Sequence, residues 1–67
     1  MITKEELAER LKKIKKEKGI NRKQLSELTG ISKVQLTNLE KGRNIPKATT
    51  IAKIANALGC EFEDLYE

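Results

Sequence analysis

Residues 33–41, KVQLTNLEK, place several hydrogen-bonding side chains on one side of a helix-length segment. At about 100° per residue, Leu36 and Leu39 fall on one side of a helical wheel, with Gln35 beside them. The opposite side, which we call the polar face, consists of Lys33, Val34, Thr37, Asn38 and Lys41. The polar face offers cations, a small apolar group, a hydroxyl and a carboxamide, and it contains no carboxylate.

The polar face carries the side-chain types that read base edges in the DNA major groove. Asn pairs bidentately with adenine, Lys donates to guanine or phosphate, Val contacts the thymine methyl, and Thr serves a base or the backbone. The alternative is an ordinary solvated face, on which glutamates would alternate with lysines as i,i+4 pairs. Because a carboxylate would repel phosphate, its absence favours base readout. The base-contacting candidates are Lys33, Val34, Thr37 and Asn38.

Polar residues on both sides of this segment are candidates for contacts with the phosphate backbone. Ser32 precedes it as an N-cap, and the free amide groups behind that cap suit a phosphate oxygen. Arg22 stands in the first turn of the preceding helical segment, where a cation is unfavourable toward the helix dipole unless an anion binds there. The alternative is that Arg22 is a surface residue without a specific role. Lys41, Arg43 and Asn44 follow the segment, within reach of the backbone that it would enter.

Caps and glycines divide the chain into helices. A Thr, Asn or Ser followed three residues later by Glu or Gln marks three helix starts, at Thr3, Asn21 and Ser32. Four glycines are expected to end the first four helices: Gly19, Gly30, Gly42 and Gly59. Pro46 disfavours helix at the residue before it, so residues 42–47 are expected to form a loop.

Apolar residues at helical spacing give each helix a side that can join a core. These residues are Leu7, Leu11 and Ile14, then Leu25 and Leu28, Leu36 and Leu39, Ile51, Ile54, Ala55 and Leu58, and finally Phe62 and Leu65. No strand pattern, linker or repeat interrupts them. We expect one all-α domain over residues 1–67, with a helix-turn-helix at about 21–42 whose second helix spans about 33–41. That unit is known for placing its second helix in the DNA major groove.

Composition narrows the classes of function. The 67 residues include no His, which excludes Ser–His and Cys–His catalysis. The single cysteine, Cys60, cannot form an intramolecular disulfide, and it is expected to be a small buried core residue rather than a redox sensor. We therefore expect no enzyme activity, no catalytic residue, no metal site and no cofactor. The net charge of +4 favours a polyanionic partner, although surplus lysine is commonly a solvated surface.

The N-terminal stretch MITKEELAERLKK is charged and helix-periodic, and it lacks the apolar region of a signal peptide. The sequence also has no run of 18 apolar residues that would span a membrane. We expect a cytoplasmic protein that is nucleoid-associated when bound to DNA, with no membrane association and no small-molecule ligand.

The chain from about Leu7 to Tyr66 resembles the helix-turn-helix family of phage lambda-type repressors, Cro proteins and their bacterial relatives. The residues that carry the resemblance are Leu25, Gly30, Ile31, Ser32, Leu36, Leu39, Glu40 and Gly42, together with the Pro46 loop and the segment IAKIANALG. The resemblance implies a compact five-helix, lambda-repressor-like domain of bacterial or phage origin. Its third helix, here about 33–41, is the recognition helix.

By position, the family implies the same base-facing set that the helical wheel selects: Lys33, Val34, Thr37 and Asn38. It also implies backbone contacts from Arg22, Ser32, Arg43 and Asn44. The two routes to the polar face are independent, because the wheel uses only helical geometry and side-chain chemistry.

The chain departs from the family at several positions. Arg22 stands where Gln is common, so it can keep a phosphate contact but is not expected to brace a base-reading side chain. Ser26 replaces the usual Ala and must bond its hydroxyl locally. Lys15 replaces an Arg that pairs with the residue matching Glu40, which leaves the pair less constrained geometrically. Lys47 stands where a capping residue usually begins the fourth helix.

The leading hypothesis is a sequence-specific transcriptional regulator, expected to be a repressor, that binds double-stranded DNA as a homodimer on a near-palindromic operator. Leu65 and Tyr66, with Met1 and Ile2, are the apolar candidates for a dimer surface, although a periodic leucine near a chain end is more often part of the core. One alternative is an antitoxin-like module whose main role is binding a protein partner. Another is a structural helical bundle whose basic face has no role.

Overall fold

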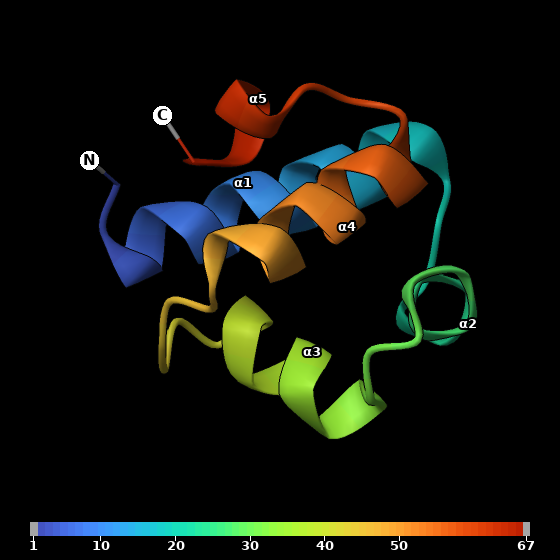
Figure 1. The fold of residues 1–67 in the computed structure, drawn as a ribbon, viewed down its shortest axis with the longest axis horizontal. Helices are drawn as coiled ribbons and strands as arrows, with labels where there is room; N and C mark the ends of the chain where they lie inside the picture. Colours follow the sequence, from blue (N-terminus) through green and yellow to red (C-terminus); the bar gives the residue numbers. More distant parts are fainter. Residues whose placement is uncertain (1, 67) are drawn as a thin grey trace.

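The computed structural model describes residues 2–66, and in this range the chain forms five α-helices joined by short turns (Figure 1). The helices are α1 (Lys4–Lys18), α2 (Arg22–Thr29), α3 (Lys33–Glu40), α4 (Ala48–Leu58) and α5 (Phe62–Tyr66). The predicted all-α fold and the helix order are confirmed. None of the helices within 2–66 has the length and apolar character needed to cross a bilayer.

The helix starts form where the capping residues predict them. Thr3 and Glu6 form a reciprocal capping box at α1, as Asn21 and Gln24 do at α2. The Ser32 hydroxyl accepts the Gln35 N–H at 3.1 Å, which satisfies one free donor of α3. α4 begins after Lys47 without a side-chain cap, as that residue type predicts.

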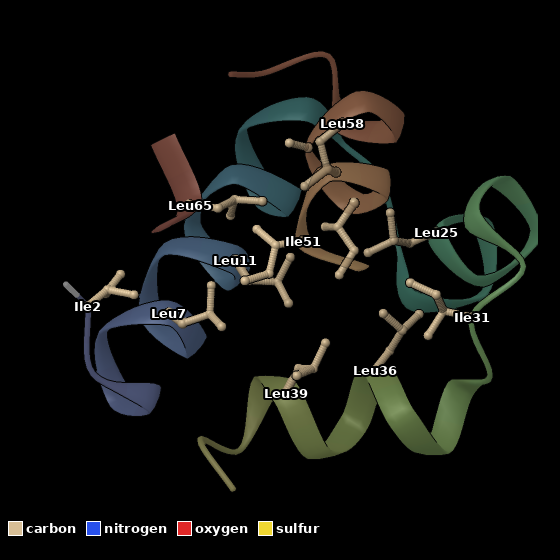
Figure 2. Packing of buried hydrophobic residues seen from close by; sticks show 12 residues of the cluster. Ile2, Leu7, Leu11, Leu25, Ile31, Leu36, Leu39, Ile51, Leu58 and Leu65 are labelled. Carbon is tan, nitrogen blue, oxygen red and sulfur yellow. The ribbon is translucent and has the colours of Figure 1, made fainter. Parts of the chain in front are cut away.

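A core of leucine and isoleucine holds the helices together. α1 and α4 lie next to each other, α3 crosses below them, and α2 packs against α3 and α4 (Figure 1). Leu36 and Leu39 point from α3 toward the buried side chains of α1 and α4, and both are almost fully buried (Figure 2). α3 is therefore attached to the rest of the fold by one side only.

The exposure of Leu28 contradicts the prediction that α2 buries this side chain. Its side chain is 62% exposed, whereas Leu25 is fully buried. α2 has only two turns, and α3 and α4 cover the side that carries Leu25. Ile31, which follows the turn after α2, is 7% exposed and joins this part of the core instead. Leu28 lines a shallow surface hollow beside α4.

Two hydroxyl residues of α2 stabilise the turn that leads into α3. The Ser26 hydroxyl donates to the Ile31 carbonyl at 2.6 Å, which confirms that this side chain bonds locally. The Thr29 hydroxyl donates to the Leu25 carbonyl at 2.7 Å and accepts the Ile31 N–H at 3.2 Å. Gly30 adopts the left-handed conformation at φ 76°, which side chains other than glycine rarely adopt. These bonds fix the angle at which α3 leaves α2.

An ionic cluster, which we call the Glu40 cluster, connects the first three helices. The buried Glu40 carboxylate of α3 accepts from the Lys15 ammonium of α1 at 2.9 Å and from Arg22 Nε of α2 at 3.1 Å. The Lys15–Glu40 pair is the one that the family resemblance implies, and the participation of Arg22 is additional. Burial alone would raise the pKa of Glu40, but the hydrogen bonds from Arg22 and Lys15 outweigh it and leave the pKa below its ordinary value.

Core packing predicts that small deletions in the core cost more stability than larger ones on the polar face. Ile51→Val removes one methylene from a side chain that is 1% exposed, and we expect a loss of about 0.5–1.5 kcal/mol. Val34→Ala removes two methyl groups from a side chain that is 72% exposed, and we expect a change within about 0.5 kcal/mol. Urea unfolding followed by circular dichroism measures both. Equal losses would contradict this assignment of the core.

The Glu40 cluster predicts a pH-dependent stability. Because the pKa of Glu40 is lower in the folded chain than its ordinary 4.5, the ionised carboxylate stabilises the fold at neutral pH. That contribution is lost as the pH falls through the folded-state pKa. Glu40→Gln should lower the free energy of unfolding at neutral pH by about 2 kcal/mol and flatten its decline in acid.

The control for this variant is Glu27→Gln, which changes an exposed carboxylate of α2. Urea unfolding between about pH 7 and pH 3 compares the three proteins, and Glu27→Gln should follow the parent chain. Parallel pH profiles for Glu40→Gln and the parent chain would rule out the stabilising role of this carboxylate.

Candidate nucleic-acid interface

The structure confirms that the polar face of α3 points away from the core. Lys33, Val34 and Lys41 are exposed, and Thr37 and Asn38 are half-buried. Gln35, which the wheel places beside the leucines, is exposed instead. Its direction lies roughly 70° from the mean direction of Leu36 and Leu39, at the edge of the packed side. A helix face with exposed cations and a partly exposed amide and hydroxyl is thus available to a ligand.

Thr37 has its hydroxyl hydrogen committed within the helix. Its Oγ1 donates to the Lys33 carbonyl at 2.8 Å. The oxygen therefore has only acceptor capacity left for a ligand, together with the adjacent methyl group. In the major groove this combination suits the amino group of cytosine or adenine, or the methyl group of thymine.

Asn38 and Arg43 form a side-chain pair at the C-terminal end of α3. Arg43 Nη1 donates to Asn38 Oδ1 at 2.8 Å. The backbone brings the two residues together, because the Arg43 N–H also donates to the Asn38 carbonyl at 3.0 Å. Gly42, at φ 68°, provides the left-handed residue that this helix ending requires. The structure thus places Arg43, expected at the phosphate backbone, beside a base-reading candidate.

The Arg22 side chain is bound by an anion of the chain itself. The sequence suggests that an anion binds near Arg22 or that this arginine has no specific partner at the surface. The structure places the Glu40 carboxylate against the Arg22 guanidinium. The hydrogen bond to Glu40 raises the pKa of Arg22. The Arg22 side chain is still 42% exposed, so part of its guanidinium faces solvent.

The remaining backbone-contact candidates lie at the two ends of α3. Ser32 is exposed at the N-terminal end, and Lys41 and Asn44 are exposed at the C-terminal end. Gly42 approaches the first turn of α1 closely enough that a Cβ there would lie 3.6 Å from the Glu5 Cα. The start of the loop after α3 is therefore held against α1.

The apolar residues expected at a dimer surface are mostly used within the chain. Leu65 is 1% exposed and Ile2 is 3% exposed, so both belong to the core and are unavailable to a partner. Leu65 faces α1 and α4 because α5 packs across both helices. Tyr66 is partly exposed, and its ring lies 5.6 Å from that of Phe62. Met1 lies outside the described residues.

Away from α3, a surface hollow lies between α1 and the turn that joins α4 to α5. It is lined by charged residues of both signs, including Lys13 and Glu17, and by Cys60. Cys60 is half-buried against the core, and burial, with the nearby Asp64 carboxylate, raises the pKa of its thiol. Within residues 2–66 no three His, Cys, Asp or Glu side chains are grouped as metal ligands would be.

The pairings of Arg22 with Glu40 and of Arg43 with Asn38 were not predicted from the sequence. A cation at an N-terminal helix turn was the signal for the first, but it does not say which anion is bound. The second had a weaker signal, a glycine followed by an arginine at the end of a helix. Both pairings depend on how the chain folds back on itself.

Comparisons with known proteins agree with this geometry. Residues 11–65 match the model of the HTH_3 family, described as helix-turn-helix. The chain is 43% identical over 53 residues to the SPbeta prophage-derived uncharacterized HTH-type transcriptional regulator YopS of Bacillus subtilis, covering 78% of this chain and 72% of YopS. It is 34% identical over 62 residues to the HTH-type transcriptional repressor RghR of the same organism, covering 91% of this chain and 46% of RghR.

The fold also matches that of a solved structure. The crystal structure of an HTH_3 family transcriptional regulator from Vibrio cholerae superposes with a TM-score of 0.87 at 33% identity, covering 94% of this chain and 35% of that one. The chain spans about half the length of some curated relatives that it matches. The sequence match, the structural match and the geometry of α3 agree. The chain therefore belongs to the HTH_3 family of helix-turn-helix, DNA-binding transcriptional regulators.

Proposed function

We propose that this chain is a sequence-specific repressor that inserts α3 into the major groove of double-stranded DNA. The observation that carries the proposal is the polar face of α3, which points away from the core, is exposed at Lys33, Val34 and Lys41, and contains no carboxylate. Lys33, Val34, Thr37 and Asn38 would contact base edges. One relative, RghR, is named a repressor, which supports this direction of regulation. Such a protein would act in the cytoplasm, on nucleoid DNA.

Contacts with phosphates at both ends of α3 would set its register on the duplex. Ser32 at the N-terminal end offers its hydroxyl hydrogen and the amide groups of the first turn. Arg22 would reach a phosphate with the exposed part of its guanidinium while Glu40 holds the rest. Lys41 and Asn44 would contact the backbone beyond the C-terminal end of α3. Arg43, which donates a hydrogen bond to Asn38 in the free chain, would lie within reach of the same backbone.

Two copies of the chain would bind a near-palindromic operator. One domain of this size buries a limited interface with DNA, and a second copy about 34 Å along the duplex increases both affinity and specificity. Because Leu65 and Ile2 are buried in the core, the partly exposed Tyr66 is the remaining described candidate among the expected dimer contacts. Contact between the copies would then involve the α5 end of the domain rather than α3.

The proposal predicts different effects from polar-face and backbone-contact residues. Asn38→Ala should weaken binding to a selected operator by about 1–3 kcal/mol and should weaken binding to random DNA less. Lys41→Ala should weaken binding to both DNAs alike and lower the slope of log affinity against log salt by about 1. Fluorescence anisotropy with labelled duplexes, across a range of salt concentrations, measures both effects.

The control is Lys53→Ala, which removes an exposed cation from α4, outside α3 and its flanks. It should leave both affinity and salt dependence near those of the parent chain. If affinity for every DNA stayed constant with salt, or if Lys53→Ala behaved like Lys41→Ala, the interface would not be the one proposed.

The dimeric arrangement predicts a strict spacing of half-sites. Inserting about five base pairs between the half-sites rotates one of them by half a helical turn and should abolish the two-to-one complex. An insertion of about ten base pairs restores the facing but roughly doubles the distance between the half-sites, which a fixed pair of these domains cannot span, so it should abolish the complex as well. The unmodified operator, on which the two-to-one complex should form, serves as the control. Sedimentation of the complexes gives the stoichiometry, and a two-to-one complex on all three duplexes would argue against a fixed dimer.

A further inference from the structure

The hydrogen bond between Arg43 and Asn38 determines which way the asparagine amide faces. A guanidinium only donates hydrogen bonds, so the atom 2.8 Å from Arg43 Nη1 must be the Asn38 oxygen. The Asn38 nitrogen, with its two N–H groups, then points away from Arg43. Asn38 is half-buried, which limits its freedom to turn, and Arg43 is exposed.

The pair presents mainly hydrogen-bond donors to a ligand. Asn38 keeps both N–H groups of its amide, while one of the two lone pairs of its oxygen is used by Arg43. The guanidinium of Arg43 keeps its other N–H groups and its positive charge. Lys41, three residues after Asn38 on the same exposed side, adds a second cation. An unpaired asparagine would instead offer a donor and a free acceptor together.

We propose that Asn38 and Arg43 act as one unit that selects a G·C base pair, instead of Asn38 pairing by itself with adenine. The inference rests on the proposed function, because it assumes that α3 lies in the major groove. Guanine presents two acceptors there, N7 and O6, whereas adenine presents the N7 acceptor and the N6 amino donor. A donor-rich, positively charged pair matches the two acceptors of guanine. The same pair would place positive charge against the amino group of adenine.

The backbone holds this pair in place before any DNA is bound. Gly42 donates to the Leu39 carbonyl at 3.1 Å, and the Arg43 N–H donates to the Asn38 carbonyl at 3.0 Å. These two bonds are the 5→2 and 6→1 pairs of a Schellman ending, which fixes the path of the chain after α3. Arg43 therefore starts next to Asn38 through its main chain as well as through its side chain. Preorganisation of this kind reduces the entropy lost on binding.

The test is selection of bound duplexes from a random pool with four proteins: the parent chain, Arg43→Ala, Asn38→Ala and Lys47→Ala. The parent chain should prefer G·C over A·T by about tenfold at one position of each half-site. Arg43→Ala should shift that position to A·T, because the freed amide can then pair with adenine. Asn38→Ala should remove the preference at that same position. Lys47→Ala, which removes another exposed cation of the loop, should leave the motif unchanged.

Circular dichroism and thermal unfolding would check that each variant folds, which we expect because Arg43 is exposed and Asn38 is half-buried outside the core. The inference is overturned if the position that depends on Asn38 selects any pair other than G·C in the parent chain. It is also overturned if Arg43→Ala weakens all sequences equally and leaves the motif intact, since Arg43 would then contact only phosphate. Absence of any motif with the parent chain would instead overturn the proposed function, and the inference with it.

Discussion

An eight-residue helix is not stable in water by itself, so the structure depends on the attachment of α3 to the rest of the domain. Leu36 and Leu39 supply that attachment on one side, where they enter the common core. The Glu40 cluster adds a directional contact, because one carboxylate binds side chains from both α1 and α2. With one side fixed in this way, the other side of α3 is free of structural duties and can carry residues chosen for a ligand.

The charged residues of α3 are distributed in the same way between its packed side and its polar face. The carboxylate of α3 that binds Lys15 and Arg22 is buried, and the exposed polar face has none. Glu40 therefore stabilises the fold without placing negative charge where a phosphate would approach. Arg22 is positioned by this carboxylate and is still partly exposed, so one side chain can join the helices and border the interface.

Periodicity and capping predict most of this fold, because each depends on residues within one or two helical turns. The helix starts at Thr3, Asn21 and Ser32 and the core position of Leu25 follow from such local signals. Leu28 shows the limit of these signals, since its exposure depends on which side of α2 its neighbours cover. At the site, the exposure of the polar face was predictable from helical geometry. The two arginine pairings were not, because they join residues whose proximity is set by the turns after α2 and α3.

The central claim is that DNA meets this domain on the polar face of α3 and its flanks. The most direct measurement is an NMR titration of the isotope-labelled chain with a duplex selected from a random pool. The account predicts that the largest shifts occur in residues 32–44 and at Arg22, while α5 and the outer side of α4 change little. The account would be contradicted if the largest chemical-shift changes occurred in α4 and α5 while the amide resonances of α3 did not change.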